Sequence, residues 1–375
     1  MVSRSLLLFQ NTIKSKKTLD DYTKHLNRFI KFAKLNDPDE LPKLSPDKIQ
    51  ELLEDYVIHL KKLVSPNSVP TYMNGIKHFC IVSRIRGIEW KIISKMYPAR
   101  VKLTGYRAWT TKEVQGMLSD TTKKRSKFLI HFLASTGGRI GILDHDLQMK
   151  HLVDMQQGCK AVLLYAGFKE EYWAFLTPEA VTFLNSYHEE RKKDGEHFTP
   201  ESPIFRTIYT VANSEAKPLS STAARMIIHR LAKSADTKRR KVSKTRYDVQ
   251  ADHGFRKRFN TILKIKNDVN SNIAEKIMGH SVTIPLDNSY LDVPVERLFE
   301  EFAKAIPELT VSDEERQEIR IVKLEKDRSE LEKKELVIEQ LKAEHNILKL
   351  KVERTVSGLS EEEFRRLKEL VKNKP

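Results

Sequence analysis

The sequence is short of cysteine and of long apolar runs. Only two of its 375 residues are cysteines, Cys80 and Cys159. Their scarcity disfavours a disulfide framework and a cysteine-based zinc site, and it fits a reducing, cytosolic compartment. No apolar run approaches the ~20 residues that a membrane-spanning helix needs, and the run from Leu6 to Phe9 is too short for a secretory signal core. We therefore expect a soluble, intracellular protein with no membrane partner.

Acidic residues are too few to balance the basic ones, and the imbalance is local. The chain has 67 Lys and Arg against 51 Asp and Glu, which gives a net charge of +16 and a pI near 9.5. From Ser312 to the end, sixteen basic residues are matched by sixteen acidic ones, so the whole excess lies in residues 1–311. Such a basic body predicts a polyanionic partner, whereas the neutral tail needs a separate explanation.

Residues 17–93 have the apolar periodicity of helices. Tyr22, Leu26 and Phe29 recur at three- and four-residue steps, and similar stretches follow further along. This spacing is typical of amphipathic helices, so we expect a compact domain of four or five helices. A flexible or lightly docked arm at 1–16 is expected before it. A basic linker containing proline and glycine is expected after it, at 94–107.

Residues 108–311 combine helices with one small patch of strand. Helical periodicity dominates, but the period changes between residues 150 and 177. Residues 161–165 and 172–176 have the composition of short strands, and the turn between them carries Lys169. The expected fold class is therefore mainly α with a small antiparallel β-sheet.

Two charged stretches have more than one interpretation. The basic run from Lys238 to Arg246 predicts a surface loop that either faces DNA or is solvated. In the tail, residues 312–375, neither glycine nor proline occurs from Asp313 to Arg354. The same position of a seven-residue repeat is occupied by Leu324, Leu331, Ile338, His345 and Val352. This pattern predicts a coiled coil, with a single long exposed helix as the alternative.

Several polar residues follow points where the backbone is expected to turn. They are Arg139 after a double glycine, Lys169 at the hairpin turn, His253 and Arg256 near a helix start, His280 after Gly279, and Tyr290 after a loop of small polar residues. An arginine fork can hold two phosphate oxygens and stays charged. A lysine or histidine can protonate a leaving alkoxide, and a tyrosine can be the covalent nucleophile. Together these residue types suit transesterification at a phosphate, while a structural or solvated role is the alternative for each.

The order of these residues resembles that of the tyrosine recombinase (phage integrase-like) family. The matching segments are S-T-G-G-R-I-G-I-L, F-K-E-E-Y, D-H-G-F-R-K-R-F, I-M-G-H-S and N-S-Y-L. The resemblance spans about residues 17–308. It implies a helical core-binding domain at 17–93, a catalytic domain at 108–311 and, in this chain, a C-terminal coiled coil in addition.

The resemblance also implies a function and a role for each residue. The chain would be a site-specific DNA recombinase or integrase of a virus or mobile element, with an archaeal source as one option. Arg139 and Arg256 would clamp the scissile phosphate, Lys169 would protonate the leaving 5′ oxygen, and His253 would act as acid or base. His280 would hydrogen-bond the phosphate, and Tyr290 would form a 3′-phosphotyrosyl link. No metal, cofactor or ATP would be required.

The expected partners are double-stranded DNA and further copies of the chain, as a dimer on each site and a tetramer in synapsis. The expected location is the cytoplasm of a prokaryote, or the host cell of a virus, in association with DNA. A type IB topoisomerase-like enzyme and a non-catalytic DNA-binding architectural protein are the alternatives. The sequence does not distinguish whether Tyr290 acts within its own protomer or on a neighbouring one.

One position departs from the family pattern. An acidic residue usually follows the first arginine by three positions, where this chain has Ile142. In the family this acid supports the active-site side chains, so its absence concerns the support of the site more than the chemistry. Asp144 and Asp146 are the candidates for a replacement, and the loss motivates the non-catalytic alternative.

Overall fold

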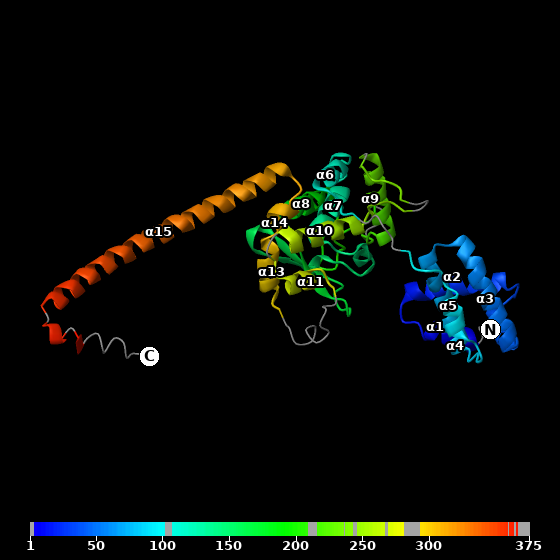
Figure 1. Cartoon of the computed structure of the whole chain (residues 1–375). Helices are drawn as coiled ribbons and strands as arrows, with labels where there is room; N and C mark the ends of the chain where they lie inside the picture. The colour runs from blue at the N-terminus through cyan, green and yellow to red at the C-terminus, as the bar shows by residue number, and fades with distance from the viewer. Residues whose placement is uncertain are drawn as a thin grey trace. The chain divides into compact units, whose positions relative to one another are not determined.

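The computed structural model divides the chain into two compact units, Met1–Thr104 and Gly105–Pro375. Figure 1 labels helices of both units. The structure describes residues 4–101, 107–208, 216–235, 237–242, 246–266, 269–280, 293–358, 360–363 and 365–366. None of the helices in these ranges is both long enough and apolar enough to cross a membrane.

The first unit is helical throughout its described residues. Its helices are α1 (Arg4–Asn11), α2 (Lys16–Phe32), α3 (Pro46–Leu63), α4 (Val69–Val82) and α5 (Trp90–Lys95), with short 3-10 turns η1 (Pro38–Lys43) and η2 (Pro66–Ser68). Local sequence sets the boundaries of α2 and α3, because Ser15 and Ser45 each accept a backbone hydrogen bond from the first turn of the helix that follows.

The first residues, expected to be a flexible or lightly docked arm, form a docked helix. Residues 4–11 form helix α1, and Phe9 is buried with its ring 5.8 Å from that of Phe79 on α4. A buried aromatic side chain stabilises a fold by about 1.5–3 kcal/mol, enough to hold a short helix against the unit. A single short apolar patch does not predict this contact, because it does not show whether a partner surface exists.

The second unit is mainly helical and contains one antiparallel sheet. Its strands, in the spatial order β1-β2-β3, are β1 (Leu152–Asp154), β2 (Lys160–Leu164) and β3 (Tyr172–Leu176). In the register, Lys160 pairs with Leu176 and Leu164 with Tyr172. The predicted hairpin and fold class are confirmed, whereas β1 was missed because three residues carry too little alternation to predict a strand.

Helices surround this sheet in the second unit. They are α6 (Thr111–Ser119), α7 (Lys124–Thr136), α8 (Pro178–Lys193), α9 (Ser221–Ser234), α10 (His253–Lys266), α11 (Ser271–Ile277), α13 (Val295–Ala303), α14 (Ile306–Leu309) and α15 (Asp313–Ser357); the 3-10 turns are η3 (Ile140–Asp144), η4 (Met149–His151) and η5 (Gln156–Gly158). The Thr110–Glu113 pair forms a capping box at the start of α6.

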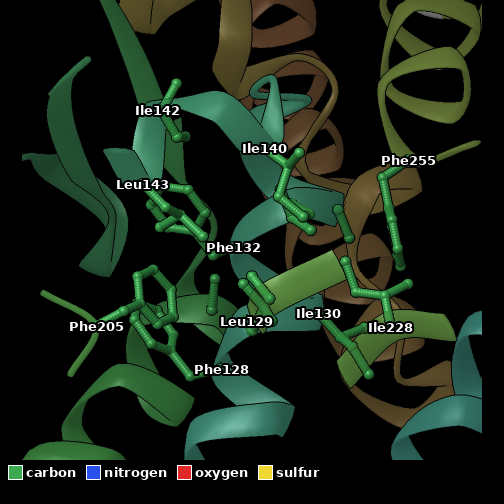
Figure 2. Close-up of a cluster of buried hydrophobic side chains, with 14 of the residues drawn as sticks. Phe128, Leu129, Ile130, Phe132, Ile140, Ile142, Leu143, Phe205, Ile228 and Phe255 are labelled. Atoms are coloured by element: carbon green, nitrogen blue, oxygen red, sulfur yellow. The ribbon is translucent and has the colours of Figure 1, made fainter. Parts of the chain in front are cut away.

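Helix α7 is the centre of the larger apolar core. Its side chains Phe128, Leu129, Ile130 and Phe132 are buried, and Figure 2 shows them among apolar residues from other elements, including Phe205 and Phe255. The helix packs on α8, α10 and β3. Because α7 is buried on all sides, the residues that directly follow it are held at a fixed place beside α10 and the sheet.

The junction between α14 and α15 is held by buried polar groups. Glu179 of α8 accepts hydrogen bonds from the backbone N–H groups of Val311 (2.6 Å) and Ser312 (2.8 Å). The Arg258 guanidinium, also buried, donates to the carbonyls of Glu308 and Leu309. The start of α15 is thus tied to the second unit by hydrogen bonds to its backbone. The apolar residues predicted for a coiled-coil seam are exposed along α15, and their pairing with a second helix stays a prediction.

This junction generates a stability prediction. Glu179→Ala leaves two backbone N–H groups without acceptors, so we expect a loss of about 2 kcal/mol or more in the free energy of unfolding. The measurement is urea denaturation followed by tryptophan fluorescence. Glu189→Ala, at an exposed position of the same helix, is the control and should change stability by no more than about 0.5 kcal/mol. Equal effects of the two substitutions would contradict the proposed role of Glu179.

Candidate active site

The buried arginine Arg256 lies at the centre of the candidate site. It is only 7% exposed, and it follows Phe255 on α10, whose ring packs in the core. Its guanidinium donates one hydrogen bond to the carbonyl of Gly137 (2.8 Å) and another to that of Met278 (2.5 Å). Burial is the main cause of a lowered pKa of Arg256, which the neighbouring Tyr172 phenol opposes. The sequence therefore places a rigid cation between the ends of two helices.

Gly137, the first residue of the double glycine, provides one of the two carbonyls that bind Arg256. Gly137 ends α7 with φ +58°, a left-handed conformation that side chains disfavour. A Cβ atom at this position would lie 2.5 Å from the Phe259 ring on α10, so glycine also permits close packing. Arg139 leaves the turn two residues later, is exposed, and donates to the carbonyl of Gly279 (3.2 Å).

The Gly279–His280 pair is explained by the end of α11. Gly279 has φ +59°, its N–H bonds to the carbonyl of Lys276 (2.9 Å), and the N–H of His280 bonds to that of Glu275 (3.0 Å). These two bonds define a Schellman motif, in which a left-handed glycine folds the next residue back over the last helical turn. The His280 ring is brought to Glu275 in this way, and its Nδ1 lies 2.5 Å from Glu275 Oε2.

The charges around this point favour an anion. Arg139 and Arg256 both lower the pKa of His280, although burial is the larger cause and the Glu275 carboxylate opposes them. Within the described residues, no carboxylate forms an ion pair with either arginine. A buried cation without a carboxylate costs several kcal/mol, so a phosphate that accepts its remaining N–H groups would be strongly favoured.

His253 lines a cavity separate from the cluster of Arg139, Arg256 and His280. It is the first residue of α10, is exposed, and lines a cavity of about 290 Å³ together with Arg225, His229, Arg239, Arg246, Tyr247, Gln250, Ala251 and Asp252. Arg239 from the predicted basic patch turns inward here: its guanidinium lies 4.0 Å from the Tyr247 ring centre and donates to the carbonyl of Val249 (2.7 Å). The cavity next to His253 is therefore strongly basic.

The structure describes Lys169 but not Tyr290, the two predicted site residues that remain besides His253 and the cluster of Arg139, Arg256 and His280. Lys169 is exposed in the turn between β2 and β3, and among the described residues no hydrogen bond or ion pair links it to that cluster. Tyr290 lies outside the described residues. The roles of all six residues consequently stay predictions.

Ile142 has an apolar environment, and neither nearby aspartate replaces the missing acid. Its side chain is 1% exposed and packs in the core beneath Gly138. Asp144 accepts hydrogen bonds from the backbone N–H (2.8 Å) and the hydroxyl (2.5 Å) of Ser221, at the start of α9. Asp146 is exposed. The two candidates therefore do not support the arginines through any described contact.

Sequence reasoning missed two residues of the site. Tyr172 on β3 lies beneath Gly279, where a Cβ atom would come within 2.3 Å of the ring, and burial raises the pKa of its phenol. Glu275 was missed although a signal existed, because a glycine just beyond a helix predicts that the residue after it returns to the last turn. Tyr172 ends the segment F-K-E-E-Y and begins a predicted strand, but its place beneath Gly279 depends on packing between distant elements. Among the described residues, no three His, Cys, Asp or Glu side chains are grouped to hold a metal ion.

Comparisons with known proteins found one matching family model and several similar structures. The model of the phage integrase family matches residues 109–296, half of the chain. The chain is similar to the crystal structure of XerA recombinase, with 20% identity, 80% of this chain and 96% of that chain covered, and a TM-score of 0.37. It is also similar to a lambda integrase dimer bound to a COC′ core site (16% identity, 77% and 75% covered, TM-score 0.49). A third similar structure is XerH site-specific recombinase bound to difH substrate (14%, 74% and 76%, TM-score 0.47). No curated protein sequence matches the chain.

Because the family model covers half of the chain, the chain belongs to the phage integrase family, that of the tyrosine recombinases. The predicted family membership is thereby confirmed. Its activity is that of a tyrosine-type site-specific recombinase or integrase.

The turn at Gly279 leads to a prediction. Gly279→Ala should lower the free energy of unfolding by about 2–5 kcal/mol, because the new Cβ adds a clash with Tyr172 to the strain of a left-handed alanine. The control is Gly195→Ala, since Gly195 has φ +84° and open space around its Cβ position. It should cost only the backbone strain, about 1–2 kcal/mol. Urea denaturation of both variants checks the difference, and equal losses would show that the contact with Tyr172 is unimportant.

Proposed function

We propose that this recombinase cuts and rejoins strands of duplex DNA through a 3′-phosphotyrosyl intermediate on Tyr290. The observation that carries the proposal is the cluster of Arg139, Arg256 and His280, where two guanidinium groups are held by backbone carbonyls and lack a described carboxylate partner. A scissile phosphate is the anion that this arrangement suits, because planar guanidinium groups match its oxygens.

The proposed chemistry is a pair of transesterifications. The Tyr290 oxygen attacks the phosphorus, the bond from phosphorus to the 5′ oxygen breaks, and the 5′ oxygen takes a proton from Lys169. Arg139 and Arg256 stabilise the charge that develops on the non-bridging oxygens. His280 hydrogen-bonds the phosphate, and His253 transfers a proton as acid or base. A 5′ hydroxyl then attacks the phosphotyrosyl link in the reverse reaction, so neither ATP nor a metal is required.

The proposed partners follow from charge and family. The positive charge of residues 1–311 suits double-stranded DNA. The basic cavity beside His253 would add positive charge for DNA binding outside the cluster of Arg139 and Arg256. We also propose a dimer on each site and a tetramer in synapsis, since the similar structures include a DNA-bound dimer. Exposed α15 would assist assembly as a coiled coil. The protein would act in the cytoplasm of a prokaryote, or in the host cell of a virus.

Loss of the nucleophile tests the covalent step. Wild-type protein should form a covalent adduct with a nicked suicide substrate, whereas Tyr290→Phe should bind the same DNA and form none, since its ring lacks the attacking oxygen. The adduct is measured by denaturing gel electrophoresis and binding by gel shift, using a randomised duplex library to find the target. Binding by wild type without any adduct would contradict the proposal. Relaxation of any supercoiled plasmid, without exchange between sites, would favour a topoisomerase-like activity.

Substitution of the central arginine tests the anion site. Arg256→Lys keeps the positive charge but not the fork that reaches both carbonyls and the phosphate. We expect the rate of adduct formation to fall about 10²–10³-fold, the usual effect of removing one donor to a developing oxyanion. Arg297→Lys, an exposed arginine on α13, is the matched control and should cleave like wild type. An Arg256→Lys variant with full activity would remove the main support for the proposed site.

A further inference from the structure

Glu275 connects His280 to a lysine on another helix. Its Oε2 lies 2.5 Å from His280 Nδ1, and its Oε1 is bonded to Lys264 Nζ of α10. Burial alone would raise the pKa of Glu275, but the hydrogen bonds from Lys264 and His280 outweigh it and hold that pKa below its usual value. The carboxylate is therefore ionised at neutral pH, and it sits between two donors.

An ionised carboxylate can only accept hydrogen bonds, so the contact decides which nitrogen of His280 carries a proton. Nδ1 must hold its proton to donate to Glu275, and this leaves Nε2 as the free nitrogen of the ring. When the ring is neutral, Nε2 has a lone pair; when the ring is a cation, Nε2–H can donate to a phosphate oxygen. A histidine that hydrogen-bonds the phosphate through Nε2 must consequently be the cation, which a neighbouring carboxylate stabilises.

The backbone fixes the pair before any DNA binds. The Schellman motif at Gly279 places His280 over the last turn of α11, where Glu275 is the residue whose carbonyl bonds to the His280 N–H. Lys264 then joins α11 to α10, the helix that also carries Arg256. The elements that place Arg256 and His280 are thus linked to each other through Glu275.

We propose that Glu275 is the positioning residue of this active site, which orients His280 and stabilises its cationic form, and that it supplies from α11 the acidic support that Ile142 cannot. This inference rests on the proposed function only for its consequence in catalysis. The hydrogen bond and the proton position on His280 are properties of the free protein and can be tested without DNA.

The charges that face His280 define the expected pH dependence. They are Arg256 from α10, Arg139 from the turn after α7 and Glu275 from α11; burial and the two arginines lower the pKa of His280, and Glu275 raises it. A phosphate between the arginines would add a second raising charge. If cleavage needs the cation, activity falls as pH rises through the pKa of His280 in the DNA complex. Removal of the Glu275 charge lowers that pKa, so the fall moves to lower pH.

The first experiment examines the free protein. Long-range ¹H–¹⁵N spectra of ¹⁵N-histidine-labelled protein report which ring nitrogen is protonated, and the His280→Gln spectrum assigns the signal. Above its pKa, His280 should carry its proton on Nδ1 in wild type and on Nε2 in Glu275→Ala. A proton on Nε2 in wild type, or an unchanged spectrum in Glu275→Ala, would overturn the proposal whether or not the protein is a recombinase.

The second experiment measures adduct formation on the suicide substrate across pH. Glu275→Gln keeps the shape of the side chain but not its charge, so we expect a loss of about 10–100-fold at neutral pH, and a descending limb at lower pH than in wild type. Glu300→Gln, at an exposed position of α13, should match wild type. A purely structural role of Glu275 would lower the rate equally at every pH, which would contradict the proposal. If wild type itself forms no adduct, the proposed function fails. The ¹H–¹⁵N spectra of His280 still test its hydrogen bond with Glu275.

Discussion

The buried guanidinium of Arg256 is the interaction on which the candidate site depends. Its partners are the carbonyls of Gly137 and Met278, at the carboxyl-terminal ends of α7 and α11. The last carbonyls of a helix lack intrahelical partners, and they carry partial negative charge. Two helix ends therefore stabilise one buried cation without a carboxylate. A carboxylate in the same place would neutralise the charge and compete with a phosphate, whereas carbonyls leave most of the positive charge available to the substrate.

This arrangement explains why both glycines have left-handed backbone. A helix that ends in a left-handed residue turns its chain sharply, so the carbonyls at the turn itself can face a neighbouring group. At Gly137 the turn also brings α7 against Phe259, and at Gly279 it brings α11 against Tyr172. Each turn then delivers a further side chain, Arg139 in one case and His280 in the other. A left-handed glycine at a helix end thus places each of the two side chains that lie near Arg256, Arg139 and His280.

The part of the site that could be predicted from the sequence is the part encoded locally. Arg139 and His280 follow glycines, and the strands that flank Lys169 are short apolar runs, so short stretches were enough to single them out. Tyr172 depends on contacts between distant elements, and α1 depends on a surface that only the folded α4 provides. Residues 281–292, including Tyr290, lie outside the described part, so the proposed role of Tyr290 rests on the segment N-S-Y-L. Glu275 is intermediate, since the glycine after α11 encodes locally that His280 turns back over the last turn, whereas the contact with Lys264 depends on another helix.

The burial of position 142 explains why it holds isoleucine instead of an acidic residue. The side chain at position 142 points into an apolar core, where an ionised carboxylate would need a buried partner to offset its desolvation. Glu275 is less constrained, because its side chain is 21% exposed and Lys264 neutralises it. Moving the acid from the turn after α7 to α11 also changes what it supports: it bonds to His280 and leaves the arginines to the helix ends. The chain can therefore keep an apolar side chain at position 142 and still hold an oriented histidine beside its two arginines.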